Sequence, residues 1–281
     1  MIMDKQMNHW IKIIPACLIL AACSKLPVAA ADPEAKSIKD FQAVELDYTL
    51  PDDVLSVCQP QTEAQSSDLT SEHESVIGCP SIDIQLVSLE PKWIQDSLNF
   101  YITQDHNPER IKFRRHLDTF ARESMHDNFV MPYYQSVEPQ FVGMHGTLAQ
   151  FAVLDDVYLG GAHGMQTTTY YIYDLALGTQ ISLYDLEIQS YDKEAGRLYE
   201  LTEAAYDRYL YAHRADIGDP EEYKEIYSLE YTDNFYFNDQ GLVLYYNPYV
   251  LSPYAMGPVE LIIPFADLEG VLRAEYLPPF D

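Results

Sequence analysis

Two β-rich runs joined by a glycine-rich turn decide the fold, and they lie in the stretch LAQFAVLDDVYLGGAHGMQTTTYYIYD, residues 148–174. Residues 148–157 and 167–174 are rich in β-branched and aromatic side chains, which favour strands. The segment Gly160–Gly164 between them holds three glycines. Glycine adopts positive φ angles at little cost and lets another segment approach its backbone closely. The stretch therefore predicts two strands with a tight connection.

Further strands are predicted on both sides of this stretch. Residues 81–86 alternate between polar and apolar side chains, as a half-buried strand does. Residues 235–246 carry a hairpin signal, because the turn sequence Asn238-Asp239-Gln240-Gly241 separates two apolar runs. Residues 175–178 are expected to join two strands, and residues 259–263 to form the last strand, which Pro264 stops.

Three helices are predicted from apolar residues spaced three or four apart. The first begins at Pro91, and its inward stripe consists of Ile94, Leu98 and Tyr101. The second begins at Asn107-Pro108, and its stripe consists of Phe113, Leu117, Phe120 and Ala121. The third spans residues 194–214, with a stripe of Leu198, Leu201, Ala205, Tyr209 and Ala212. Helices mixed with mostly antiparallel strands predict an α+β fold.

The expected organisation is a small N-terminal α/β part, residues 80–150, and a larger C-terminal α+β part, residues 151–281. Residues 23–79 are rich in Ser, Glu, Gln, Asp and Pro and poor in aromatic side chains. Such a composition does not support a packed core, so we expect a tether there.

The N-terminal residues have the layout of a secretory signal. Lys5 and Lys12 precede an apolar run that is too short to span a bilayer as a helix. The run ends at Leu20-Ala21-Ala22-Cys23, which resembles the bacterial lipoprotein box. We therefore expect a signal peptide over residues 1–22 and acylation of Cys23. Several acyl chains anchor a protein durably. Because Ser24 and not Asp follows Cys23, the sorting rule for lipoproteins favours an outer membrane, facing the periplasm or the surface.

Two further cysteines remain in the exported chain, Cys58 and Cys79. Exported proteins meet an oxidising environment, so this pair predicts a disulfide that closes a polar loop. A redox-active pair fits less well because Cys-x-x-Cys spacing is missing, and a metal site fits less well because no pair of histidines lies nearby.

The composition is strongly acidic, with 17 basic against 44 acidic residues and a formal net charge of −27. Nucleic acids and anionic lipids require Lys and Arg, so we expect no nucleic-acid partner and contact with the membrane through the lipid anchor only. No Lys or Arg occurs between Arg122 and Lys193. The acidic charge favours a cationic partner. The alternative is that the acidic residues only form a solvated surface.

Two segments are candidates for ligand binding. The first is the turn formed by Gly160, Gly161, Ala162, His163 and Gly164. A structural turn histidine is the alternative there, since no nucleophile motif or metal-ligand pair accompanies His163. The second is a loop rich in proline and tyrosine, which are typical of rigid binding surfaces, and its candidates are Tyr249, Pro253, Tyr254 and Gly257. The alternative is a packed connection whose tyrosines cover a sheet edge. Met144-His145-Gly146 is interpreted as a turn.

Several motifs follow one order along the chain: Gly160-Gly161-Ala162-His163-Gly164, Tyr171-Ile172-Tyr173-Asp174-Leu175, Leu183-Tyr184-Asp185-Leu186, Gly241-Leu242-Val243, Pro253-Tyr254-Ala255 and Ile263-Pro264-Phe265. This order resembles the extracytoplasmic C-terminal domain of RsiV-type anti-sigma factors, over about residues 155–275. Residues 80–150 resemble more weakly the small α/β domain that precedes it. The resemblance implies a module that binds lysozyme and has no catalytic activity. Neither a membrane-spanning helix nor a deacetylase catalytic domain accompanies the motifs, so only the binding module carries over.

The sequence therefore predicts an envelope lipoprotein with a non-catalytic ligand-binding domain. The expected partner is a lysozyme-like cationic muramidase or a peptidoglycan-related ligand, and no cofactor, metal or catalytic residue is expected. The alternative is an envelope enzyme, or an enzyme accessory, that acts on peptidoglycan or another glycan. A polar constellation in a deep cleft would favour that alternative, and exposed aromatic loops would favour binding.

Overall fold

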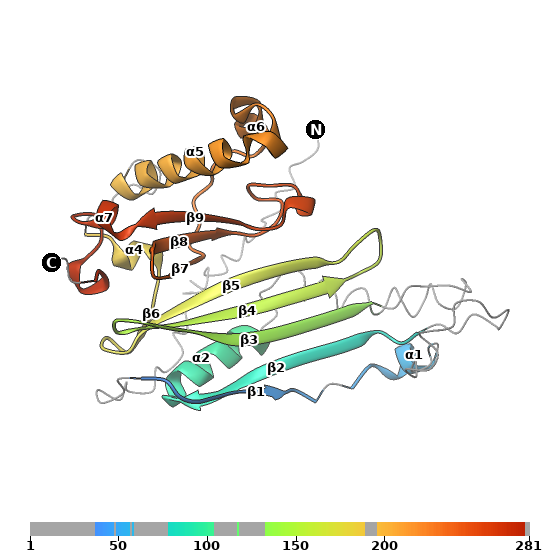
Figure 1. Ribbon diagram of the computed structural model, residues 1–281. Coiled ribbons are helices and arrows are strands. Elements are labelled where there is room, and N and C mark those ends of the chain that lie inside the picture. The colour runs from blue at the N-terminus through green and yellow to red at the C-terminus, as the bar shows by residue number, and fades with distance from the viewer. Residues whose placement is uncertain are drawn as a thin grey trace, which may run out of the picture.

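The computed structural model describes residues 37–47, 49–56, 58, 78–103, 117, 133–188 and 196–278. Within these residues the chain forms a six-stranded sheet, a three-stranded sheet and helices that cover them (Figure 1). All neighbouring strands are antiparallel except β2 and β3. The predicted α+β class is confirmed.

The larger sheet has the strand order β1-β2-β3-β4-β5-β6. Its strands are β1 (Lys39–Glu45), β2 (Ser81–Glu90), β3 (Tyr134–His145), β4 (Leu148–Tyr158), β5 (Met165–Asp174) and β6 (Thr179–Ile181). The hairpin β4–β5 contains the two strands expected around the glycine-rich turn. Gly146 turns the chain between β3 and β4, at φ 56°, and Gly178 turns it between β5 and β6, at φ 65°.

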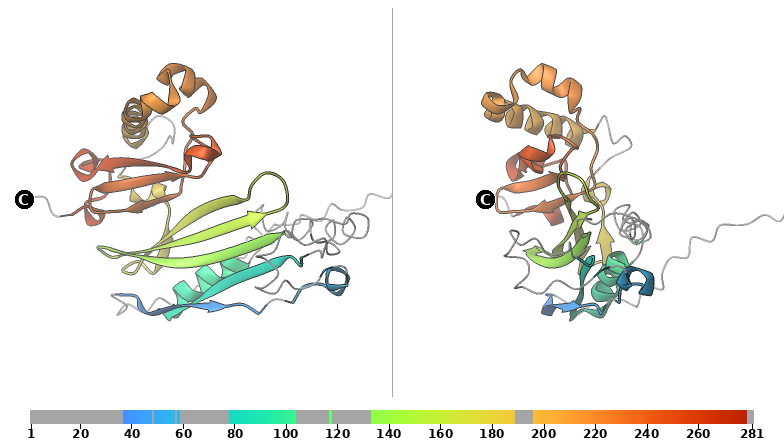
Figure 2. Two further views of the ribbon diagram at one scale, coloured as in Figure 1. Left: turned by 45° about the vertical axis from the view of Figure 1, so that its right-hand side comes forward. Right: turned by 90° about the vertical axis from the view of Figure 1, so that its right-hand side faces the viewer.

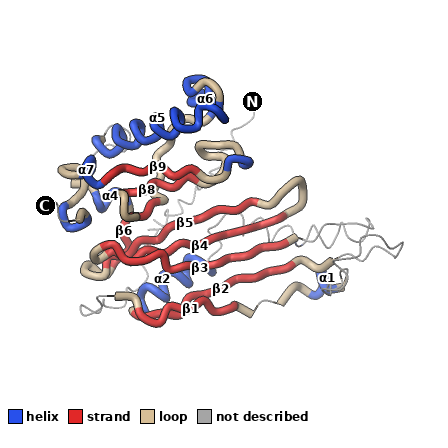
Figure 3. Tube along the Cα trace, in the orientation of Figure 1, coloured by secondary structure: helices blue, strands red, loops and turns tan. Residues whose placement is uncertain are grey.

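Helix α2 (Lys92–Thr103) covers one face of this sheet (Figures 1 and 3). Ile94 and Leu98 are buried against the strands, as predicted. Tyr101 is 36% exposed, so its predicted inward place is wrong, and Ile102 is buried instead. Residues seven and eight positions after Ile94 both fall on the same helix face, so periodicity could not choose between them. Tyr101 lies at the rim of the sheet, where its ring stacks on that of Tyr171.

The smaller sheet consists of β7 (Phe235–Phe237), β8 (Gly241–Tyr246) and β9 (Val259–Pro264). Helix α5 (Arg197–Ile217) lies across one of its faces (Figure 2). The other elements of this half are α4 (Leu183–Leu186), α6 (Pro220–Ile226), α7 (Phe265–Leu268), and the 3-10 helices η1 (Tyr254–Met256) and η2 (Ala274–Tyr276). The hairpin β7–β8 was predicted from its turn.

The inward stripe of α5 was predicted in part. Its buried side chains are Leu198, Leu201, Thr202, Ala205, Tyr206 and Leu210. Tyr209 is half-buried and Ala212 is exposed. Beyond Leu210 only the partly buried Ile217, the last residue of the helix, still packs against this core.

Side-chain amides join the two sheets. Strand β6 pairs with only the last three residues of β5. Further along that edge, Asn234 accepts a hydrogen bond from the Tyr170 N–H at 2.7 Å and donates to the Thr168 carbonyl at 2.8 Å. Asn247 accepts from the Thr168 N–H at 2.7 Å. Buried Gln150 on β4 bonds both backbone groups of Phe237 on β7. These amides satisfy backbone groups that would otherwise be left without partners where the sheets diverge.

The N-terminal part of the described chain is more ordered than its composition suggested. Strand β1 and helix α1 (Asp52–Leu55) lie within the range 23–79 that was expected to be a tether. In β1 only Phe41 is half-buried and the other six residues are exposed, as is common for an edge strand. The sequence of β1 therefore shows little of the apolar alternation by which a strand is predicted. The predicted disulfide between Cys58 and Cys79 is confirmed. Cys58 lies in a small core with Val54 and Leu117.

The predicted division between residues 150 and 151 falls inside β4, and strands on both sides of it share one sheet. The expected signal peptide, residues 1–22, and the acylation site Cys23 lie outside the described residues. So does most of the second predicted helix, of which Leu117 alone is described, as helical and buried. No helix in the described part of the chain has the length and apolar character needed to cross a membrane.

Candidate functional site: an exposed aromatic patch

The two segments that the sequence singled out meet at one end of the molecule, where the tip of the β4–β5 hairpin and η1 lie side by side (Figures 1 and 2). The His163 ring stacks on the Tyr254 ring, with centroids 3.9 Å apart and planes 14° apart. The Tyr249 hydroxyl lies 3.3 Å from His163 Nε2, although the two residues are 86 positions apart in the chain. We call His163, Tyr249 and Tyr254, with the supporting Tyr134 and Tyr158, the aromatic patch.

Hydrogen bonds fix the tautomer of the neutral His163 ring. Its Nδ1 lies 2.7 Å from the Gly164 carbonyl oxygen. A carbonyl can only accept, so Nδ1 carries the hydrogen and Nε2 is left as an acceptor. Nε2 then accepts from the Tyr249 hydroxyl. Both ring nitrogens are engaged, so the ring is held as a stacking surface between the loops.

The glycines of the turn act in two ways. Gly160 and Gly161 have φ angles of 88° and 95°, which glycine adopts without strain. Gly164 is needed for close packing, because a Cβ atom there would lie 2.8 Å from the Tyr134 hydroxyl and 3.0 Å from the Val157 carbonyl oxygen. As a result the turn is held against Tyr134, while Gly161, Ala162 and His163 remain exposed.

The tyrosine loop is braced from within. The Tyr249 N–H donates to the Ser252 carbonyl, and the Ser252 hydroxyl donates to the Gly257 carbonyl. Tyr249 has a φ of 73°, which is uncommon for a residue with a side chain and is found mainly where the surroundings impose it. Helix α6 supports the loop, since the Tyr223 hydroxyl donates to the Leu251 carbonyl. The loop therefore presents Tyr249, which is 50% exposed, and the half-buried Tyr254 in a fixed arrangement.

Tyr134 and Tyr158 form the base of the aromatic patch and were missed from the sequence. Their rings stack with centroids 5.9 Å apart. The Tyr158 hydroxyl donates to the Gly161 carbonyl at 2.9 Å, and the Tyr134 hydroxyl donates to Asp156 Oδ1 at 3.1 Å. Burial and the neighbouring Asp156 carboxylate raise the pKa of Tyr134, so it stays a neutral donor. No local sequence signal marked these residues, because their contact depends on the register of β3 and β4.

His145 has a structural role, but it is the last residue of β3 and not part of the predicted turn, which begins at Gly146. Its ring stacks on Phe237 at 4.2 Å and on Phe265 at 5.5 Å. Its Nε2 lies 2.8 Å from the Tyr276 carbonyl oxygen and therefore donates to it. The histidine thus fastens the β3–β4 turn to the C-terminal segment.

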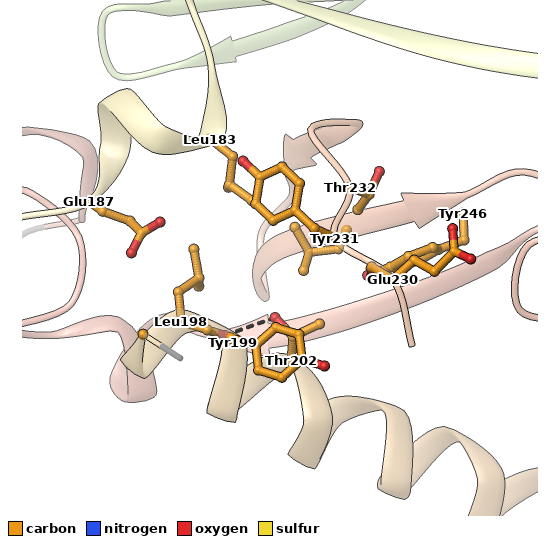
Figure 4. A pocket seen from close by; sticks show the side chains of 11 residues that line it. Leu183, Glu187, Leu198, Tyr199, Thr202, Glu230, Tyr231, Thr232 and Tyr246 are labelled. Carbon is orange, nitrogen blue, oxygen red and sulfur yellow. Dashed lines mark hydrogen bonds between the residues drawn. The ribbon is translucent and has the colours of Figure 1, made fainter. Parts of the chain in front are cut away.

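A small pocket and an open groove lie in the described part of the chain, and neither is lined by residues of the aromatic patch. The enclosed pocket between α4, the start of α5 and residues 230–232 holds about 20 Å³, which is room for roughly one water molecule (Figure 4). An open groove of about 390 Å³ lies beside α5, and its Lys224 is held by Asp207 and Glu221. No group of three or more His, Cys, Asp or Glu side chains in the described part of the chain is arranged to bind a metal ion.

Comparisons with known proteins show what part of this chain is similar to. Solved structures of two DUF3298 family proteins have a similar fold. The protein from Pseudomonas aeruginosa PAO1 is 16% identical, with a TM-score of 0.59, covering 86% of this chain and 97% of its own. The protein from Bacteroides fragilis NCTC 9343 is 22% identical, with a TM-score of 0.57, covering 84% and 94%. At such identities the likeness concerns the fold alone. No curated protein matches. Residues 188–266 match the family model described as "Protein of unknown function (DUF3298)".

Proposed function

We propose that this protein is a lipoprotein of the cell envelope whose folded domain binds a macromolecular ligand without catalysing a reaction. The ligand is a lysozyme-like cationic muramidase, and the aromatic patch is the binding surface. Such a protein acts as a binder or inhibitor, attached to the membrane only through the acyl chains on Cys23.

The observation that carries the proposal is the ring contact between His163 and Tyr254. It joins two distant segments into one exposed surface of rigid aromatic side chains. Tyrosine supplies large contact area at a small cost in side-chain entropy and is enriched among the residues that dominate binding energy. A surface that is already fixed before binding loses less entropy when the complex forms.

Charge and resemblance support the choice of partner. The chain carries a formal net charge of −27, and complementary charge raises the rate at which a cationic protein associates. The motifs shared with RsiV-type anti-sigma factors include both loops of the aromatic patch. The match of residues 188–266 to the DUF3298 model agrees with that resemblance as far as the C-terminal part of the fold.

Calorimetric titration of the detergent-purified protein with hen egg-white lysozyme tests the proposal. We expect binding at micromolar concentrations or below, and at least about tenfold weaker binding by Tyr254→Ala, which corresponds to about 1.4 kcal/mol. Tyr184→Ala is the matched control, because Tyr184 is 51% exposed on α4 and outside the aromatic patch. The control should bind like the wild type, and melting curves should be similar for all three proteins. No binding by the wild type would reject lysozyme as the partner.

The anchor is tested separately by Cys23→Ser. Without the thiol no acyl chain attaches, so we expect the variant to be unprocessed or soluble after cell fractionation at high salt. Normal processing together with full membrane association would reject the lipoprotein assignment.

A further inference from the structure

On the second face of the six-stranded sheet, β7 and β8 pack over the part next to β5, whereas no described element covers the part formed by β2, β3 and the end of β4. Helix α2 packs on the first face, and the second is turned towards the viewer in Figure 1. We call the side chains that β2, β3 and β4 place on this second face beside the aromatic patch the open face: Ser81, Asp83, Tyr134, Ser136, Glu138, Leu154, Asp156 and Tyr158. Asp83 and Glu138 are exposed, and Ser136, Leu154 and Asp156 are half-buried.

We infer that the open face is a docking surface for a basic protein and extends the binding site beyond the aromatic patch. This inference rests on the proposed function and names the surface that attracts the partner before the aromatic side chains engage it. Three observations support it: the strand register, the charge of the face, and its continuity with the aromatic patch.

The register places carboxylates in neighbouring positions. Asp83 lies directly opposite Ser136, and Ser136 lies directly opposite Asp156, so the three form one row across β2, β3 and β4. Adjacent strands are about 4.8 Å apart, which puts the two carboxylates of this row roughly 10 Å from each other at the backbone. Glu138, opposite Leu154, is the next residue of β3 on the same face.

The charges of the open face are of one sign. No Lys or Arg occurs between Arg122 and Lys193, the stretch that contains β3, β4 and β5. The described part of β2 adds Asp83 and no base. The distance between Asp83 and Asp156 is close to the Debye length, which is about 10 Å at 0.1 M salt. The two carboxylates therefore repel each other at low ionic strength. A basic partner relieves that repulsion, whereas phosphate-bearing nucleic acids and anionic membranes increase it.

The open face leads into the aromatic patch without a break. Tyr134 and Tyr158 lie opposite each other at the ends of β3 and β4 and belong to both surfaces. The Tyr134 hydroxyl donates to Asp156, which links the row of carboxylates to the side chain that packs beneath Gly164. A partner that contacts Tyr254 therefore comes within reach of the carboxylates. We assign electrostatic steering to the open face and short-range contact to the aromatic patch.

Association kinetics with lysozyme test the inference. We compare the wild type with Asp83→Asn/Glu138→Gln, which removes two charges from the open face and leaves Asp156 and its tyrosine contact intact. The matched control is Glu222→Gln/Glu225→Gln, which removes two exposed charges from α6. At low ionic strength we expect the open-face variant to associate at least about threefold more slowly, and this difference to shrink at 0.15 M salt. Dissociation rates and control kinetics should stay close to those of the wild type.

The outcomes separate the two proposals. Unchanged association by the open-face variant, or an equal slowing in the control, overturns the docking surface while leaving the proposed function in place. No lysozyme binding by the wild type overturns the proposed function and the docking surface with it. A loss of affinity that comes only from faster dissociation also contradicts the inference. Steering by charge acts on the encounter of the two proteins and not on the formed complex.

Discussion

Two histidines of this protein, His145 and His163, have different roles because their rings contact different residues. His145 stacks between aromatic rings and donates to a backbone carbonyl, which fastens a turn to the C-terminal segment. His163 makes equally defined contacts, but its ring is exposed and joins two loops. The sequence offered both as turn residues with a glycine next to them. Only the partners, more than 80 positions away in each case, distinguish the structural histidine from the surface one.

Gly241 is fixed by a close contact at the start of β8. A Cβ atom there would lie 2.0 Å from the Ile263 carbonyl oxygen on β9. Backbone cannot move away as a flexible side chain can, so Gly241→Ala should lower the free energy of unfolding by about 3 kcal/mol. Gly146→Ala serves as the comparison, because Gly146 has open space around it and a φ of 56°, and only about 1 kcal/mol of conformational strain is expected. Urea unfolding of both variants measures the difference. A loss at Gly241 no larger than at Gly146 would contradict the steric explanation.

At the scale of elements, the amides of Asn234 and Asn247 replace a missing strand along β5. Asn234→Ala leaves the Tyr170 N–H without its acceptor, which should cost about 1–3 kcal/mol of stability. Hydrogen exchange gives the sharper measurement: the Tyr170 amide should exchange faster in Asn234→Ala, and the Thr168 amide faster in Asn247→Ala. Each variant controls for the other. Equal acceleration of both amides in either variant would mean that the edge opens as one unit.

Some helices and strands could be predicted from the sequence and others could not. The β7–β8 hairpin was predictable because Asn238 and Gly241 mark a turn between two apolar runs. Strand β1 was not, since only Phe41 contacts the core and its pairing with β2 adds no apolar signal. Helix α6 was also missed, although Asp219 caps it and Pro220 starts it, because only Tyr223 is buried in its short length.

The candidate site was predictable as two loops but not as one surface. Glycines at 160, 161 and 164 and the tyrosines of residues 249–254 drew attention by their local chemistry. Their meeting depends on how the smaller sheet sits against β5, which amides from distant positions determine. The contribution of Tyr134 depends on strand register. Local patterns carry no information on contacts of this kind.

On the scale of the whole molecule, many of the described tyrosines are buried enough to resist ionisation. Burial is the main cause that raises the pKa of Tyr231, Tyr236 and Tyr276 to about 12, and carboxylates add to it. An unfolded chain ionises its tyrosines near pH 10. Because the folded state disfavours the charged form, this stability is fully present below pH 10 and is lost as pH rises through about 12.

Urea unfolding between pH 8 and pH 12, with absorbance at 295 nm to follow tyrosinate, checks this dependence. We expect a fall in stability that starts near pH 10, and a set of tyrosines that ionise only as the protein unfolds. Free titration of all tyrosines near pH 10 without loss of stability would contradict the burial that the structure assigns to them.

We propose that two distant loops form one binding surface. Hydrogen exchange of the protein with and without lysozyme tests it most directly, because exchange is read along the chain and requires no substitution. We expect binding to slow exchange in residues 158–164 and 249–257 together and to leave α4, with the exposed Tyr184, unaffected. Protection of only one of the two loops, or protection confined to other segments, would contradict it.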